Sequence, residues 1–590
     1  MALQDMFRER SMRTILDGLA SAQLRDHRPR LVFFCSALTL IVSLLLGGGT
    51  RGGFLSDAVL ELLAIPALLI SFVSLVELPH AGASVARRKH LLLGACFAIL
   101  LLPLVQLVPL PPWIWTRLPG RDEVVAVYDL LGHRRPWMPL SVSPNATWLS
   151  FLSLLPPIAI VLGVVQLSYQ ERRALTVAFI AFGVASVFLG LAQLAQGPSS
   201  SLRFFTVTNA TDAVGFFANR NHFAALLYTV LLFAAAWAID LGYKTRSLRD
   251  LGTLELSTGR ALGAIVVVVI CLLAAEAVVR SRAGLILTIG ALTGAFALGF
   301  VDRRQATAAG ARSGRIMLVA LIVAVILVIQ FALYQVLSRY ALDSLQDARI
   351  SFARNTFQAA KAFMPFGSGL GTFVPVYGMF EKPSDVLLNT FANHAHDDFL
   401  ELLQETGLMG MALVGGVLVW LGFSAAKIWW KPPAHASHLD YSLSRAATLV
   451  IGLLIAHSFV DYPLRTGAMM AVFAFSCALL IEPWAGAEAT MRVEAEPKRD
   501  RISRKAAEHA ARTAVSLRTS PGSSAPPAQE TKVSPQPLRQ PAELWGDEID
   551  WPEEWRKSGE HKPSEHKSSE HKSSEQRRSG EDFDQSKPKK

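Results

Sequence analysis

Charged residues and cysteines are both scarce in this chain of 590 residues. Only 18% of the residues are charged, whereas 51% are hydrophobic. A typical soluble domain has about 25% charged residues, so this balance argues against a soluble protein. The four cysteines lie in apolar stretches without metal-ligand spacing, and neither a metal centre nor a disulfide framework is indicated. We interpret them as small packing residues: Cys35, Cys96, Cys271 and Cys477.

The alternation of polar and apolar residues that marks the strands of a membrane barrel is also missing. The chain has long continuous apolar runs instead, and a helix needs roughly 20 such residues to cross a bilayer. We therefore predict an all-α, polytopic integral membrane protein with about 12 transmembrane helices. The predicted spans are Leu31–Leu46, Val59–Val76, Leu91–Val108, Leu149–Leu167, Leu175–Leu194, Phe223–Ile239, Leu262–Val279, Leu285–Val301, Ile316–Leu337, Leu408–Ala426, Ala446–Val460 and Ala468–Ile481.

Basic residues are concentrated before the first span and in every second loop, for example at Arg87, Arg172, Lys244, Arg303 and Lys427. Because basic loops stay in the cytoplasm, this bias places both termini there. The net charge of +10 fits an anionic inner leaflet better than nucleic acid. We expect no cleavable signal peptide, since the first apolar run follows a long basic segment.

Composition divides the chain into three parts. Residues 1–30 form a basic cytoplasmic segment, and residues 31–484 form the membrane domain, which includes a large periplasmic loop at 338–407. Residues 485–590 are rich in Pro, Ser, Glu, Lys and Arg, and a five-residue repeat begins at His561. Such a segment buries too little apolar surface to offset the entropy of ordering, so we predict a disordered cytoplasmic tail.

A first polar cluster, Asn219–His222, lies at the outer mouth of a predicted span. A guanidinium at this depth, here that of Arg220, can bind a phosphate through two parallel hydrogen bonds. The alternative is an interfacial anchor that reaches lipid headgroups. Four consecutive polar residues, including Asn219, Asn221 and His222, exceed what anchoring requires and favour a site.

A second cluster extends from Glu276 to Arg282. Glu276 lies within a predicted span, where an ionisable residue is by default a functional hypothesis. Arg280 is four residues further on, so the two side chains are expected to pair on one helix face. Arg282 would then remain for an anionic ligand. The alternative is a structural Glu276–Arg280 pair, with Arg282 as an anchor.

The third cluster consists of His394, His396, Asp397 and Asp398. A histidine beside carboxylates can act as a general base, and the same group could bind a divalent cation. The alternative is that the acids cap the following helix, because carboxylates are favoured at helix N-termini. The predicted topology brings all three clusters to the external face, which suits an anionic, lipid-linked substrate.

In order and spacing, these stretches resemble the O-antigen ligase and polymerase superfamily of bacterial envelope glycan assembly, over about residues 30–484. Asp397 stands where the family often has Asn. The stretches that carry the resemblance are Asn219–Ala224, Ser281–Gly284 and His396–Leu400 with Glu405–Gly407; weaker matches are Pro139–Ser141 with Pro144 and Ala146–Thr147, Arg354 with Gly367–Gly371, and His457–Asp461.

The resemblance implies a multi-pass protein of the bacterial inner membrane. It also implies a metal-independent, inverting glycosyltransferase without cofactors that uses a glycan on undecaprenyl diphosphate. It implies that Arg220, Arg280 and Arg282 bind the diphosphate and that His396 with Asp397 activates the acceptor hydroxyl. The expected supporting residues are Asn219, Asn221, His222, Glu276 and Asp398.

The acceptor would be another lipid-linked repeat or lipid A–core. The His457–Asp461 stretch resembles polymerases and favours the first, with a ligase as the alternative. A lipid-linked glycan flippase is less favoured, because transporters concentrate charged groups near the bilayer midplane. Other polysaccharide assembly proteins are possible partners.

Overall fold

The computed structural model describes residues 29–76, 83–205, 208–250, 256–303, 345–386, 392–431 and 436–483. Within these ranges, ten helices are long and apolar enough to cross a membrane, and Gly467–Leu479 is a shorter apolar helix. The predicted all-α polytopic fold is thereby confirmed. The predicted span Ile316–Leu337 and the C-terminal tail lie outside the described residues.

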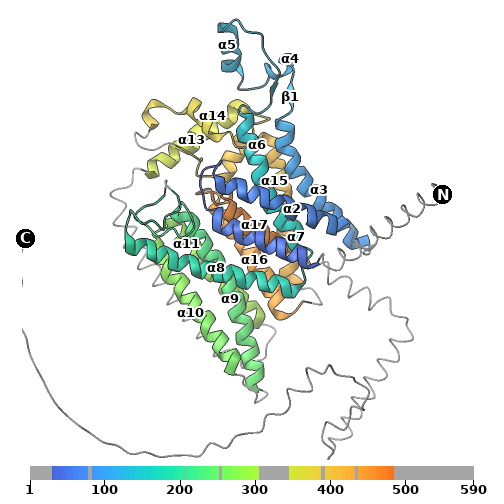
Figure 1. The fold of residues 1–590 in the computed structure, drawn as a ribbon, viewed down its shortest axis with the longest axis vertical. Helices are drawn as coiled ribbons and strands as arrows, with labels where there is room; N and C mark the ends of the chain where they lie inside the picture. The colour runs from blue at the N-terminus through green and yellow to red at the C-terminus, as the bar shows by residue number, and fades with distance from the viewer. Residues whose placement is uncertain are drawn as a thin grey trace, which may run out of the picture. The chain divides into compact units, whose positions relative to one another are not determined.

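Each predicted span within the described residues overlaps a helix. Figure 1 shows these helices as ribbons. After a first helix at Pro29–Leu46 come α2 (Leu55–Val76), α3 (Ala83–Gln106), α4 (Pro112–Trp115), α5 (Asp122–Leu130), α6 (Pro144–Ser153), α7 (Leu155–Val164), α8 (Tyr169–Gln196), α9 (Arg220–Asp250), α10 (Leu256–Val279), α11 (Arg282–Arg303), α13 (Leu345–Phe363), α14 (Phe373–Phe380), η1 (Pro383–Asp385), α15 (Asp398–Trp430), α16 (His438–His457), η2 (Pro463–Arg465) and α17 (Gly467–Leu479).

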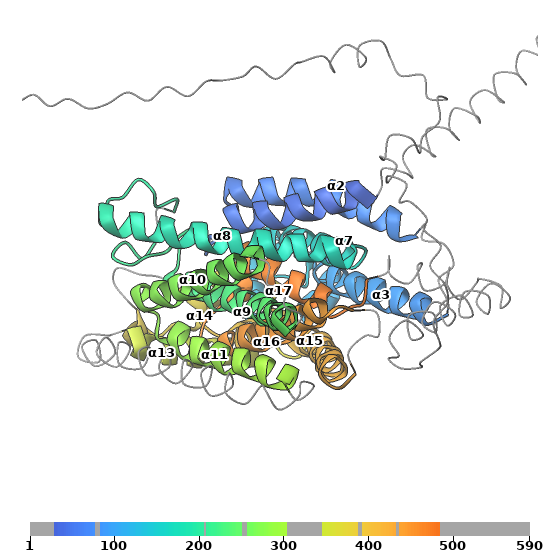
Figure 2. The ribbon, with the colours of Figure 1, turned by 90° about the horizontal axis from the view of Figure 1, so that it is seen from below.

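Helix α9 lies at the centre of the packing. It contacts α8, α10, α11 and α16, and 72% of its span is buried, against 22% for α10 and 11% for α15. Figure 2 shows α9 near the middle of the helices, with α2 and α15 towards opposite edges. Residues on several faces of α9 therefore meet other helices, so polar groups at its N-terminus can contact several chain segments at once.

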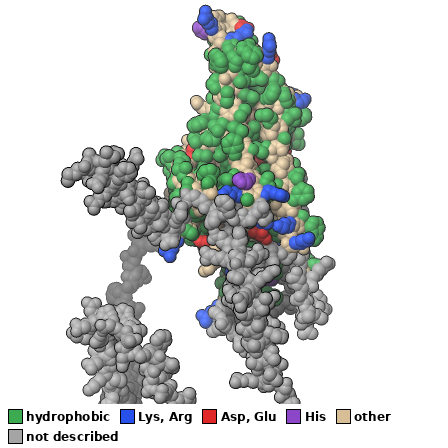
Figure 3. Space-filling view, turned by 90° about the vertical axis from the view of Figure 1, so that its right-hand side faces the viewer, with side chains coloured by type: hydrophobic (Ala, Val, Ile, Leu, Met, Phe, Trp, Pro, Cys, Tyr) green, Lys and Arg blue, Asp and Glu red, His purple; other side chains and the backbone are tan. Residues whose placement is uncertain are grey.

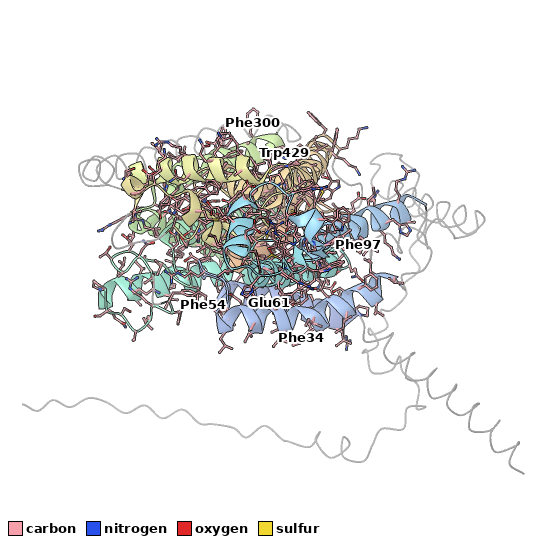
Figure 4. All side chains as sticks on the ribbon, turned by 90° about the horizontal axis from the view of Figure 1, so that it is seen from above. Phe34, Phe54, Glu61, Phe97, Phe300 and Trp429 are labelled. Atoms are coloured by element: carbon pink, nitrogen blue, oxygen red, sulfur yellow. The ribbon has the colours of Figure 1, made fainter. Side chains whose placement is uncertain are left out.

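The outer surface of the helices is apolar. Phe34, Phe97 and Phe423 are each at least 60% exposed, and Figure 4 shows Phe34 and Phe300 at opposite edges. In the space-filling view, hydrophobic side chains cover the middle of the described face, and Lys and Arg gather towards its two ends (Figure 3). So large an apolar surface is expected where lipid tails cover the protein.

Helix α15 begins ten residues before the predicted span Leu408–Ala426. It is broken at Gly407, which adopts φ 58° and ψ −151°. A Cβ on this glycine would lie 2.1 Å from the carbonyl oxygen of Pro365. Only glycine combines this left-handed backbone with such a close approach.

The segment between α3 and α6 contains the only strands among the described residues. β1 (Pro109–Leu110) and β2 (Met138–Pro139) pair antiparallel, and α4 and α5 lie between them in the chain (Figure 1). Trp115 is buried and its Nε1 donates to the carbonyl of Pro136 (2.8 Å). This predicted external loop is therefore folded.

Candidate functional site

The three polar clusters meet at one end of the helices, where they are joined by a line of hydrogen bonds. Nδ1 of His396 donates to Oδ1 of Asp461 (2.9 Å). Nδ2 of Asn221 donates to Oδ2 of the same carboxylate (2.5 Å), and Oγ of Ser281 donates to Oδ1 of Asn221 (2.9 Å). One residue of each cluster thus belongs to a single chain of hydrogen bonds, in which Asp461 connects the first cluster to the third.

Asp461 follows α16, in the loop before α17, and is fully buried. Burial alone would raise the pKa of its carboxyl group. The hydrogen bond and the charge of His396 oppose that effect and hold the pKa well below the usual range. The Asp461 carboxylate is therefore ionised at neutral pH and can orient an imidazole and stabilise its protonated form.

The imidazole of His396 is fixed on three sides. It stacks on Phe352 of α13 (centroids 5.9 Å, interplanar angle 16°) and meets the ring of Tyr462 edge-on (4.9 Å). Its side chain is 20% exposed, and no described residue forms a hydrogen bond to Nε2. With Nδ1 held by Asp461, Nε2 is the nitrogen that can accept a proton from a substrate.

Tyr462 is packed among histidines of the first and third clusters. Its ring centroid lies 4.9 Å from that of His222 and 4.3 Å from that of His394. Burial raises the pKa of the Tyr462 hydroxyl, which lies near the amides of Asn219 and Asn393. His222 itself is buried, and neither ring nitrogen has a hydrogen-bond partner among the described residues. Both Asn219 and His222 thus support the position of Tyr462.

Two of the three predicted diphosphate-binding arginines gather around Asp212, in the loop before α9. Nη1 of Arg220 lies 2.6 Å from Oδ2 of Asp212, and Nη1 of Arg280 lies 4.0 Å from Oδ1. Arg203 donates to the main-chain carbonyl of Asp212 (3.0 Å), and burial lowers the pKa of this arginine. Arg282 begins α11 and is half-buried. One buried carboxylate therefore orients arginines from two predicted clusters.

The predicted Glu276–Arg280 ion pair is wrong. Helix α10 ends at Val279, and Arg280 adopts a left-handed backbone with φ 59°, so the side-chain geometry of residues four apart on a helix is lost. Arg280 turns to Asp212 instead. The carboxylate of Glu276 is buried against Gly284, where a Cβ would lie 2.6 Å from Oε1. In the part of the chain that the structure describes, neither oxygen has a hydrogen-bond partner.

Asp397 and Asp398 have structural contacts. The Asp397 side chain caps α15 by accepting a hydrogen bond from the main-chain N–H of Leu400 (3.0 Å), and burial raises the pKa of this carboxyl group. Asp398 accepts a hydrogen bond from Oγ of Ser458 (2.7 Å). The carboxylate that contacts His396 is that of Asp461, and the helix-capping alternative holds for Asp397.

The weaker family-like stretches form a scaffold beside the site. Val142 donates to the carbonyl of Ser368 (2.8 Å), and Oγ1 of Thr147 donates to that of Leu370 (2.8 Å). Gly369 donates to the carbonyl of Glu405 (2.8 Å). Three segments far apart in the chain are thus joined mainly through their backbones, which accounts for the small residues in these stretches.

Sequence reasoning missed three charged residues of this region: Asp461, Asp212 and Arg465. Asp461 had a usable signal, since it closes the His457–Asp461 stretch and follows a predicted span at the same membrane face. Asp212 and Arg465 had none, because each is defined by contacts with residues of another segment. Among the described residues, no group of three His, Cys, Asp or Glu side chains is arranged to hold a metal ion.

A family model described as O-Antigen ligase matches residues 264–415. This region extends from α10 into α15 and includes the second and third clusters, Arg280–Arg282 and His394–Asp398. No curated protein matches the chain. Over residues 264–415, this match confirms the predicted resemblance to the O-antigen ligase and polymerase superfamily, in a chain whose apolar helices make it a multi-pass membrane protein.

Proposed function

We propose that this protein is an inverting glycosyltransferase that uses an undecaprenyl-diphosphate-linked glycan at the periplasmic face of the inner membrane. The observation that carries the proposal is the line of hydrogen bonds from His396 through Asp461 and Asn221 to Ser281. It couples a proton acceptor to the turn that holds Arg280 and Arg282. Transfer from a diphosphate requires both functions close together.

The arginines bind the donor. As the bond between the anomeric carbon and the phosphate oxygen breaks, negative charge develops on the diphosphate, and fixed guanidinium groups stabilise it. Arg220, Arg280 and Arg282 supply that positive charge, and Asp212 orients Arg220. Their charge takes the part that a divalent cation has in many nucleotide-sugar enzymes, so we expect transfer to continue in excess chelator.

His396 activates the acceptor. Its Nε2 takes the proton of a sugar hydroxyl, and the resulting oxygen attacks the anomeric carbon opposite the diphosphate. The new carbon–oxygen bond forms, the bond to the phosphate oxygen breaks, and undecaprenyl diphosphate leaves with the electron pair. Asp461, in the role that the sequence suggested for Asp397, stabilises the imidazolium that forms.

The acceptor that we favour is the end of a second lipid-linked glycan, which makes the enzyme a polymerase. The likeness of the His457–Asp461 stretch to polymerases supports this choice. Arg349 of α13 supports it as well, because its Nη1 donates to the carbonyl of Val460 (3.3 Å), next to Asp461. A cation there is a candidate for binding a second diphosphate.

The experiment uses the purified full-length protein in liposomes, with synthetic lipid-linked repeats as the only sugar source. A ladder of products with increasing length is the expected result. Transfer that occurs only after lipid A–core is added would identify a ligase instead. Movement of the lipid-linked glycan across the bilayer without any new glycosidic bond would contradict the proposal and identify a flippase.

Sidedness has its own test, which uses cysteine-free protein with single cysteines placed beside Arg220 or His396. Both positions should react with a membrane-impermeant reagent in intact spheroplasts. Reaction only after lysis would place the site in the cytoplasm and exclude a periplasmic donor.

A further inference from the structure

His396 has an unfavourable backbone conformation. Its φ is 56°, and Arg280 is the only other non-glycine residue with positive φ among the described residues. A side chain with a Cβ rarely adopts this left-handed conformation, which persists only where the surroundings fix it. If His396 is the base of the proposed function, the groups that fix it contribute to catalysis without touching the substrate.

Glu401 fixes the chain before His396. Its Oε2 accepts a hydrogen bond from the main-chain N–H of Ala395 (2.8 Å), and its Oε1 accepts one from Nδ1 of His394 (2.9 Å). Nε2 of His394 lies 3.0 Å from the carbonyl oxygen of Thr50. Both ring nitrogens of His394 thus face acceptors, which requires a doubly protonated imidazole. Glu401 holds the two residues before His396 through both carboxylate oxygens.

The chain after His396 is fixed as well. Asp397 caps α15, and the main-chain N–H of Asp398 donates to the carbonyl of Ser458 (2.8 Å). The residues on both sides of His396 are therefore held in place by hydrogen bonds. A chain held on both sides cannot relax to a negative φ without breaking one of these anchors.

Arg465 of η2 holds Glu401 in turn. Asp398, Glu401 and Glu405 are three and four residues apart, so they share one face of α15. Nη1 of Arg465 lies 3.5 Å from Glu401 and 2.7 Å from Glu405, and its Nε lies 3.6 Å from Asp398. All three carboxylates are buried. Arg465 is the cation that keeps this acidic face ordered beneath the site.

We propose that Glu401 is a positioning residue for the glycosyl transfer. Together with His394 and Arg465, it holds His396 in the left-handed conformation that presents Nδ1 to Asp461 and leaves Nε2 for the acceptor hydroxyl. This inference deepens the proposed function and depends on it.

The test is Glu401→Gln, which keeps the size of the side chain and removes its charge, measured by the liposome assay. We expect kcat to fall by about 10- to 100-fold, because a displacement of about 1 Å at a reacting group has an effect of this size. The KM for the lipid-linked donor should stay unchanged, because the arginine contacts are untouched. The profile of kcat against pH should keep its shape, since Glu401 transfers no proton.

Glu405→Gln is the matched control. Glu405 lies on the same face of α15 and is closer to Arg465, but it makes no hydrogen bond to residues 394–396. It should lower thermal stability about as much as Glu401→Gln while kcat per folded enzyme stays near the wild-type value. If Glu401→Gln fails to fold, His394→Gln replaces it, with an expected loss of kcat at unchanged KM.

Two results would overturn the inference: wild-type kcat in Glu401→Gln, or equal loss of kcat in both glutamine variants. A wild-type protein without any transfer activity would instead overturn the proposed function. The two failures are therefore distinguishable in one set of measurements.

Discussion

Two charged regions of this protein are opposite in composition. Around Asp212, one buried carboxylate holds Arg220 and Arg280, and Arg282 lies in the same turn as Arg280. Around Arg465, one guanidinium is shared by three buried carboxylates of α15. The arginine side chains of the first region are 23% and 44% exposed, whereas the carboxylates of the second are at most 9% exposed.

Under the proposed function, the difference separates a binding region from a supporting one. In that function, the excess of partly exposed positive charge binds the anionic donor. A buried acidic face that shares one guanidinium is shielded from an outside ligand and serves to hold the chain. The presence of charged residues at a membrane face is therefore only a weak indication of a binding site. Their exposure to solvent and the sign of the net charge in the region are stronger indications.

The largest expected effect lies between the two regions. His396→Ala and Asp461→Asn should each reduce transfer by about 10²- to 10⁴-fold, the usual contribution of a general base. Asp397→Asn is the control, because asparagine also caps helices well and leaves Asp461 in place. Rates are measured per folded enzyme with the lipid-linked donor. An Asp397→Asn variant as inactive as Asp461→Asn would return the catalytic role to Asp397.

Removal of an arginine tests the first region. Arg220→Ala and Arg282→Ala should each lower kcat by about 100- to 1000-fold, because each removes charge stabilisation of the leaving diphosphate. Arg134→Ala removes the same charge from an exposed position in the predicted external loop and should leave transfer unchanged. Equal losses in all three variants would indicate a general electrostatic effect in place of a site.

Removal of the central cation tests the second region. Arg465→Gln leaves three buried carboxylates without their guanidinium and should lower the free energy of unfolding by about 3–5 kcal/mol. Arg465→Lys keeps the charge and should recover part of that loss. Thermal inactivation in detergent, followed by size-exclusion chromatography, measures both variants. Wild-type stability in Arg465→Gln would mean that the acidic face needs no internal cation.

The smallest expected effect is a pH dependence within the second region. Burial would lower the pKa of His394, but the charge and hydrogen bond of Glu401 outweigh burial and raise it above 6.5. A raised pKa stabilises the fold fully below the unfolded value of about 6.5, and this contribution is lost as pH rises through the higher folded value. Thermal stability should therefore fall over that interval in the wild type, and the slope should be smaller in His394→Gln. Parallel curves would show that His394 does not titrate with folding.

The spans and the three polar clusters could be predicted from the sequence. The thickness of the bilayer fixes how many consecutive apolar residues a spanning helix needs. The spans from Leu31–Leu46 to Ala468–Ile481 can therefore be recognised as apolar runs in the sequence. The clusters stand out because polar and ionisable side chains next to the hydrocarbon region are energetically costly, so their presence there indicates a functional role. The family resemblance in the order of these clusters is a property of the sequence as well.

Which charges pair was decided only by the tertiary structure. Asp397 is adjacent to His396 in the chain, yet its carboxylate caps α15, and the acid at His396 comes from Asp461, 65 residues away. Glu276 and Arg280 have helical spacing, yet the helix ends between them. Hydropathy predicts each membrane span separately from its own residues. Ion pairs at the helix ends depend instead on which helix ends are brought together by the packing around α9.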